Sequence, residues 1–215
     1  MEPLQLPSEE EINADYDQGK EAVVTARLLW KVLPLSKKRG KPKQRLAKNL
    51  IDHFQLRKRE TQPLSFLPFA SQYESSCAGL IAALPDWFGI PEANAAYLRD
   101  LALLPAWVAL SGDRLVGAAA LAAHFPGAFE IHFLAVHPDC HRRGIGRGLV
   151  ELLEGEARQR GGRWIHVKTL GPSHPDPFYA RTRAFYAALG YEPLFESSAI
   201  WGPENPAVVL IKFLC

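Results

Sequence analysis

A glycine-rich loop between a strand-like run and a helix-like run constrains the fold of this chain more than any other feature. The apolar run at residues 129–136 ends at His137 and Pro138, and proline cannot continue a sheet ladder. The loop at residues 141–146 follows, and apolar residues then recur at helical spacing at Leu149, Val150, Leu152, Leu153 and Ala157. The order of strand, loop and helix predicts an α/β protein whose helix begins at an anion-binding loop.

The residues of this loop suit a phosphate. Gly144 and Gly146 let the backbone approach an oxygen closely, and the first N–H groups of a helix lack a partner within it. Arg142, Arg143 and Arg147 add charged donors. A Walker A pattern is absent, and a dinucleotide fingerprint would need a third glycine at the correct spacing. Two glycines alone are also compatible with an ordinary tight turn whose arginines are solvated.

Periodicity along residues 62–215 predicts an α/β (α+β) domain with a mixed, partly parallel sheet of about six to seven strands and helices on both faces. The strands are expected at residues 64–69, 106–110, 115–123, 129–136, 164–169, 193–197 and 208–213. The helices are expected at residues 72–84, from Pro91 onward, at 145–160 and at 179–189.

Residues 1–61 differ in composition and are predicted to form a helical, basic N-terminal extension. Helical patterns at 8–33 and 44–59 flank a run of lysines and arginines. Residues 45–52 and 10–24 weakly resemble fragments of an insertion-sequence transposase, and we interpret the extension as a fused or degenerate remnant. A solvated linker is favoured for the basic run over nucleic-acid contact, so nucleic acid is not an expected partner.

Overall composition favours a cytoplasmic protein. The 215 residues carry 25 Lys and Arg against 23 Asp and Glu, a net charge of +2 that implies neither nucleic acid nor membrane. The three cysteines form no CxxC pair, as in reduced proteins. No apolar stretch is long enough to span a membrane, and the first residues lack a secretory-signal pattern. Monomer and homodimer are both compatible with these features.

Two motifs in order resemble the GNAT superfamily of N-acetyltransferases. The loop at residues 141–146 resembles the superfamily's Gln/Arg-x-x-Gly-x-Gly/Ala acyl-CoA loop, with His141 at its first position, and Phe185-Tyr186 before Gly190-Tyr191 resembles its second signature. The resemblance covers about residues 62–215 and implies the GNAT fold, acetyl-CoA as co-substrate and transfer to an amine by direct attack in a ternary complex. The residues that it implies for the coenzyme are Leu134, Ala135, Val136, His141, Arg142, Arg143, Gly144, Ile145, Gly146 and Arg147.

Acetyl transfer also needs a base and an acid. Glu130 is the candidate base, because Glu-Ile-x-Phe-x-Ala-Val resembles the strand of the histone-acetyltransferase branch, and burial is expected to raise its pKa. His132 is the alternative base. The resemblance implies Tyr186 as the acid at the leaving sulfur, with Tyr179 as a weaker substitute where the family often has Asn. An acyl-cysteine route through Cys140 and a metal site are not expected.

The acceptor side is predicted from the proline-rich loops at residues 170–178 and 201–206 together with Trp87 and Phe88. The expected substrate-binding residues are Trp87, His132, His174, Asp176 and Trp201. A small-molecule or peptide amine is the expected acceptor, and its identity cannot be read from the sequence. A non-catalytic acyl-CoA sensor and a nucleic-acid-binding protein remain the alternatives.

Overall fold

The computed structural model describes residues 62–214 of the chain. Of these residues, all except Gln62 belong to one compact unit that begins at Pro63. The two helices, the basic run and the transposase resemblance expected in residues 1–61 lie outside the described residues, so these predictions and the domain boundary at residue 61 remain untested.

Between residues 62 and 214, seven strands and four α-helices form at the positions that the sequence pattern predicts. In chain order the elements are β1 (Leu64–Pro68), the 3-10 helix η1 (Ser71–Tyr73), α4 (Glu74–Ala82), α5 (Pro91–Leu103), β2 (Ala106–Ser111), β3 (Arg114–Phe125), β4 (Ala128–Val136), η2 (Pro138–Cys140), α6 (Ile145–Gln159), β5 (Trp164–Leu170), α7 (Pro177–Ala187), β6 (Glu192–Ser197) and β7 (Ala207–Phe213). Within residues 62–214 no helix has both the length and the apolar character that crossing a bilayer requires.

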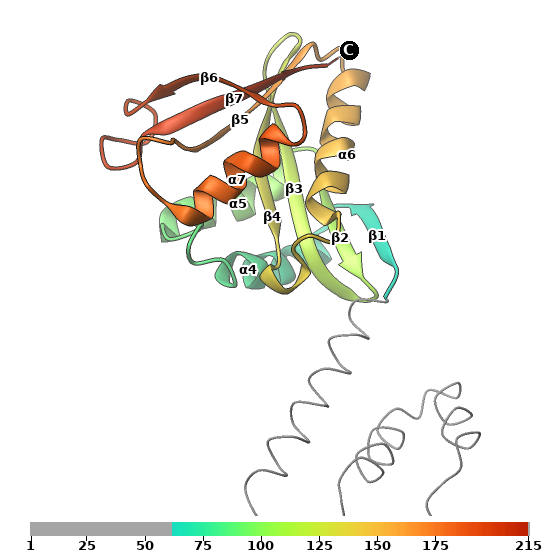
Figure 1. The fold of residues 1–215 in the computed structure, drawn as a ribbon. Coiled ribbons are helices and arrows are strands. Elements are labelled where there is room, and N and C mark those ends of the chain that lie inside the picture. The colour runs from blue at the N-terminus through green and yellow to red at the C-terminus, as the bar shows by residue number, and fades with distance from the viewer. Residues whose placement is uncertain (1–61, 215) are drawn as a thin grey trace, which may run out of the picture. The chain divides into compact units, whose positions relative to one another are not determined.

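All seven strands belong to one mixed sheet with the order β1-β2-β3-β4-β5-β7-β6 (Figure 1). β4 and β5 are parallel, and the other neighbours are antiparallel. The crossover between the two parallel strands is α6, as a parallel connection requires. The predicted α/β fold with a mixed sheet is therefore confirmed.

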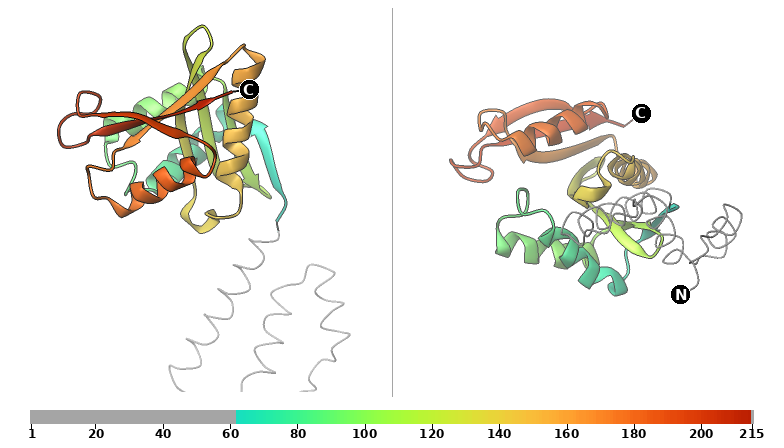
Figure 2. Two further views of the ribbon diagram at one scale, coloured as in Figure 1. Left: turned by 45° about the horizontal axis from the view of Figure 1, so that its top comes forward. Right: turned by 60° about the horizontal axis from the view of Figure 1, so that its bottom comes forward.

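Helices cover the two faces of the sheet (Figure 2). α4 and α5 pack on one face, where Cys77, Leu80 and Leu101 meet Val108 and Phe133 in one core cluster. On the opposite face α6 packs on β2, β3 and β4, and α7 packs on β5, in a second cluster. The apolar stripe predicted for α6 accounts for most of this packing, because Leu149, Val150, Leu153 and Ala157 lie in the second cluster, whereas Leu152 is only half-buried.

Two irregularities of β4 shape the site. Its parallel pairing with β5 covers only three residue pairs, from Ala128 with Trp164 to Glu130 with His166. The register against β3 also shifts, because Ala120 faces Phe133 whereas the next residue, Leu121, faces Ile131. One extra residue, His132, is therefore accommodated as a β-bulge, which reverses the alternation of side chains along the strand.

Candidate active site

A cleft of about 760 Å³ opens where β4 and β5 diverge. Its walls come from β4, β5, the start of α6, the α7 helix and the segment between α4 and α5. It brings together nine of the ten residues predicted for the coenzyme: Leu134, Ala135, Val136, His141, Arg142, Gly144, Ile145, Gly146 and Arg147. Arg143 is not a lining residue, and its guanidinium donates to Sγ of the buried Cys140 at 3.7 Å.

The N-terminus of α6 lies in this cleft and offers unpaired backbone donors. The first helical bond runs from the N–H of Gly148 to the carbonyl of Gly144 at 2.9 Å, and no side chain caps the helix. The preceding N–H groups of the first turn therefore face a ligand or solvent. Gly144 has φ 80°, and Arg142 has φ 61°, so the loop adopts the left-handed backbone that glycine accommodates best. This geometry fits the predicted anion site.

Gly146 has a second reason to lack a side chain. A Cβ at this position would lie 3.2 Å from the ring of Phe185 in α7. The two sequence motifs therefore contact each other, because the loop's second glycine allows α6 to approach the aromatic residue of the second signature. His141 is also held in place, since its Nε2 donates to the Val136 carbonyl at 2.8 Å.

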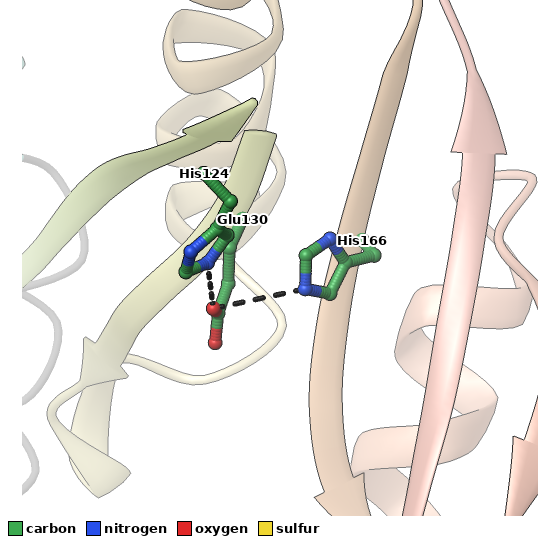
Figure 3. Close-up of side chains that lie close together, drawn as sticks. All are labelled: His124, Glu130 and His166. Atoms are coloured by element: carbon green, nitrogen blue, oxygen red, sulfur yellow. Dashed lines mark hydrogen bonds and ion pairs between the residues drawn. The ribbon is translucent and has the colours of Figure 1, made fainter. Parts of the chain in front are cut away.

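Glu130 is buried at the point where β4 and β5 part, and basic side chains from β3 and β5 converge on its carboxylate. Nε2 of His124, at the end of β3, lies 2.5 Å from Oε2, and Nε2 of His166 lies 3.6 Å from the same oxygen (Figure 3). Nζ of Lys168 lies 2.9 Å from Oε1. Burial alone would raise the pKa of Glu130, but hydrogen bonds from His166, Lys168 and His124 lower it to about 2. The expectation of a raised pKa is therefore wrong.

The ligand atoms of His124, Glu130 and His166 lie within 4.8 Å of one another, a spacing at which such groups can hold a metal ion. The ammonium of Lys168 on the same carboxylate opposes a cation at this point. The arrangement is better described as one carboxylate that neutralises several basic side chains. The absence of metal chemistry remains a prediction.

His132, the extra residue of the β4 bulge, contacts α5. Its Nε2 lies 2.7 Å from Oδ2 of Asp100, and its ring lies against Tyr97 with the centroids 5.7 Å apart. Both His132 and Tyr97 line the cleft. A carboxylate that fixes one ring nitrogen orients the imidazole, which is the usual support of a histidine that moves protons.

Tyr186 of α7 lines the cleft and is 3% exposed. Burial raises the pKa of its hydroxyl far above the ordinary value, so the proton stays on the oxygen. The predicted substitute, Tyr179, also lines the cleft, but its hydroxyl donates to the carbonyl of Trp87 at 3.0 Å. Burial raises the pKa of Tyr179 to about 12.

Three of the five residues predicted for the acceptor line the cleft, namely Trp87, His132 and Trp201. His174 and Asp176 do not. Oδ1 of Asp176 accepts the N–H groups of Phe178 and Tyr179 at 2.8 Å each, so this carboxylate caps the start of α7. Trp87 is fixed to the same helix, because its Nε1 donates to Oγ1 of Thr182 at 3.0 Å.

Sequence reasoning missed the partners of the two candidate bases. His166 and Lys168 alternate with the apolar Ile165 and Val167, and this alternation within a strand was a usable signal for a polar face. Asp100 on α5 and His124 at the end of β3 carried no local signal. They reach the site through tertiary packing and strand register.

Comparisons with known proteins agree with this architecture. Residues 104–193 match the family model described as an acetyltransferase (GNAT) domain. No curated protein matches the chain. The fold prediction and the prediction of an acyl-CoA-dependent acetyltransferase are both confirmed.

Three solved structures illustrate the fold. A GNAT-family protein from Desulfovibrio desulfuricans has a TM-score of 0.63 and 18% identity, with 71% of this chain and 100% of the other covered. An aminoglycoside 6'-N-acetyltransferase complexed with coenzyme A has a TM-score of 0.58 and 20% identity, with 70% and 97% covered. The ribosomal-protein-S18-alanine N-acetyltransferase from Escherichia coli has a TM-score of 0.58 and 14% identity, with 71% and 94% covered.

Proposed function

We propose that this chain, an acyl-CoA-dependent acetyltransferase with a GNAT domain at residues 104–193, transfers the acetyl group of acetyl-CoA to a primary amine by direct attack in a ternary complex. The observation that carries the proposal is the composition of a single cleft. An uncapped helix N-terminus lies on its wall together with Glu130, His132 and Tyr186.

The coenzyme's pyrophosphate binds at the start of α6 in this proposal. The free N–H groups of the first turn and the positive end of the helix dipole favour an anion. Arg142 and Arg147, which line the same region, add charge. A structure of similar fold, the aminoglycoside acetyltransferase, is a complex with coenzyme A, which supports acetyl-CoA as the co-substrate here.

The pantetheine arm lies along the edge of β4 that β5 leaves. Beyond Glu130 no β5 residue pairs with β4 within residues 62–214, so backbone groups of this edge are available to the arm. An N–H of this edge polarises the thioester carbonyl. Leu134 and Val136 are the strand residues proposed for this contact, and both line the cleft.

The proton of the acceptor amine leaves through Glu130 or His132. A pKa of about 2 makes Glu130 a weak acceptor alone, but His124, 2.5 Å away and partly exposed, provides a path to solvent. His132, oriented by Asp100, is the second candidate. Glu130→Gln and His132→Gln distinguish them, because the variant that removes the base loses turnover while its affinity for acetyl-CoA is retained.

Tyr186 protonates the leaving thiolate. Its raised pKa keeps the proton in place until sulfur develops a negative charge, and its position on the cleft wall fits this role. The amine attacks the thioester directly in this proposal. Cys140 is buried and its Sγ accepts from Arg143, so no covalent intermediate is assigned to it.

The acceptor enters between the α4–α5 segment and the C-terminal loops, where Trp87 and Trp201 line the cleft. Two proteins of this fold are named for very different amines, an aminoglycoside and a ribosomal-protein alanine, so the fold leaves the acceptor open.

Two measurements test the proposed function. Acetyl-CoA and coenzyme A should each raise the melting temperature of the full chain, whereas duplex DNA should not. A screen of small-molecule and peptide amines that detects free coenzyme A thiol should then identify turnover. Stabilisation without turnover on any amine would favour the acyl-CoA sensor, and stabilisation by DNA alone would favour the nucleic-acid-binding alternative.

A further inference from the structure

Lys168 places an amine beside a candidate base inside the proposed acetyl-transfer cleft. Its Nζ lies 2.9 Å from Oε1 of Glu130, and its side chain lines the cleft and is 32% exposed. Lys168 lies on β5 just beyond the last pair that this strand forms with β4, so it borders the opening between the two strands. An external acceptor that gives its proton to Glu130 would have to bring its nitrogen to this same region.

A second lysine of the chain provides an internal comparison. Lys212 is the only other lysine within residues 62–214. It forms an ion pair of similar length, with Nζ 2.8 Å from Oε1 of Glu154, and its side chain is 25% exposed. Lys212 does not line the cleft. The two lysines therefore differ mainly in their access to the place where the thioester is expected.

We propose that Lys168 is a self-acetylation site, at which the enzyme transfers the acetyl group of its bound acetyl-CoA to its own side chain. The proposal rests on the proposed function, because it uses the same cleft and the same donor. Beyond the proposed function, self-acetylation makes Lys168 a modification site. The Lys168 amine is the one that lies beside Glu130 when no external acceptor is bound.

The step balances as an ordinary aminolysis of a thioester. The Lys168 ammonium gives one proton to the Glu130 carboxylate, from which His124 or His166 passes it toward solvent. The free amine attacks the carbonyl carbon, a C–N bond forms and the C–S bond breaks. The nitrogen then loses its second proton to solvent, the thiolate takes the proton of the Tyr186 hydroxyl, and solvent returns one proton to the Tyr186 oxygen. The products are an amide on Lys168, the coenzyme A thiol and one released proton.

Acetylation would change the site electrostatically. An acetyl-lysine is neutral and cannot hold an ion pair with Glu130. Among residues 62–214, His124 and His166 would then be the carboxylate's remaining basic partners, and an amide would occupy the space beside it. Self-acetylation is thus expected to compete with an external amine for the same position.

Mass spectrometry of the full chain after incubation with acetyl-CoA tests the proposal. The expected result is one acetyl group on Lys168, seen as a tryptic peptide spanning residues 164–181, because trypsin cannot cut after an acetylated lysine. Lys212 should stay unmodified and report the background of uncatalysed acetylation. The rate per molecule should not depend on protein concentration, since donor and acceptor belong to one chain.

Variants separate catalysed modification from chance reactivity. Glu130→Gln should slow the modification of Lys168 by about 100-fold, the usual contribution of a general base, and Lys212→Arg should leave it unchanged. Equal labelling of Lys168 and Lys212, or no labelling of Lys168, would overturn the proposal. Melting temperatures taken on the same samples show whether acetyl-CoA binds, and binding without labelling would leave the proposed function standing.

Discussion

Nε2 of His132 lies 2.7 Å from Oδ2 of Asp100, and this contact joins the bulge of β4 to α5. The bulge places the imidazole on the cleft, and the carboxylate fixes its orientation and tautomer. His132 lines the cleft, whereas Asp100 on α5 does not. The contact can therefore be tested by changing Asp100, without replacing a residue of the cleft wall.

Asp100→Asn should lower kcat/KM for the acceptor by about tenfold while the Kd for acetyl-CoA stays the same, because the amide cannot hold the imidazole as firmly as the carboxylate. Steady-state kinetics and calorimetric titration measure the two quantities. Asp113→Asn, in the exposed turn between β2 and β3, is the matched control and should change neither. An equal loss in both variants would contradict a role for the pair.

Tyr186→Phe should reduce kcat by 10-fold to 100-fold with little change in coenzyme affinity, because the ring is kept while the proton donor is lost. Tyr191→Phe is the control. It removes a buried hydrogen bond to Glu154, 3.1 Å long, outside the cleft, and should cost about 1 kcal/mol of unfolding free energy with full turnover per folded molecule. Normal turnover in Tyr186→Phe would exclude it as the acid.

Gly144→Ala should destabilise the protein by about 1 kcal/mol and weaken coenzyme A binding, because alanine resists the φ of 80° that orients the first turn of α6. Gly155→Ala, in the same helix with open space around its Cβ position, should instead stabilise by about 0.5 to 1 kcal/mol and leave binding unchanged. Urea unfolding measures the stability of each variant, and calorimetric titration measures its affinity for coenzyme A. Similar effects of the two substitutions would mean that the loop conformation does not matter.

Asp176→Ala should destabilise the protein by about 1 kcal/mol without raising the KM for the acceptor, since the carboxylate caps α7 and does not line the cleft. Asp176→Asn should keep most of the stability, because asparagine is also a good cap. A raised acceptor KM in both variants would restore Asp176 as a substrate ligand.

Glu130→Gln should destabilise the protein in a pH-dependent way. The pKa of Glu130 is lowered to about 2, so its ion pairs stabilise the fold above the ordinary carboxyl pKa and lose this effect as pH falls toward 2. The difference in unfolding free energy between wild type and variant should be about 2 to 3 kcal/mol at pH 7 and should shrink steadily below pH 4.5. Urea unfolding at several pH values measures it, and a constant difference would contradict the ion-pair cluster.

The sequence predicted the elements well because their signals are local. Within residues 62–214, sequence patterns located the seven strands and the four α-helices, and glycine spacing located the loop that precedes α6. Helix boundaries were less accurate. α7 was expected at residues 179–189 but begins at Pro177, because the cap at Asp176 was not recognised.

The chemistry around Glu130 could not be predicted in the same way. Its pKa depends on His124 and His166, which come from two neighbouring strands and meet it only through the sheet register. The bulge at His132 depends likewise on how β3 pairs with β4. The regular alternation of a strand cannot reveal that the side chains change faces at this residue.

The short pairing of β4 with β5 has a mechanical consequence. Three residue pairs join the antiparallel β1–β4 half of the sheet to the β5-β7-β6 half, and Glu130 is part of the last pair. A small rotation of one half against the other about this junction would move the unpaired ends of β4 and β5 more than it would move Glu130. In such a rotation the Glu130 carboxylate would keep its neighbours, and the width of the opening would change mainly at its far end.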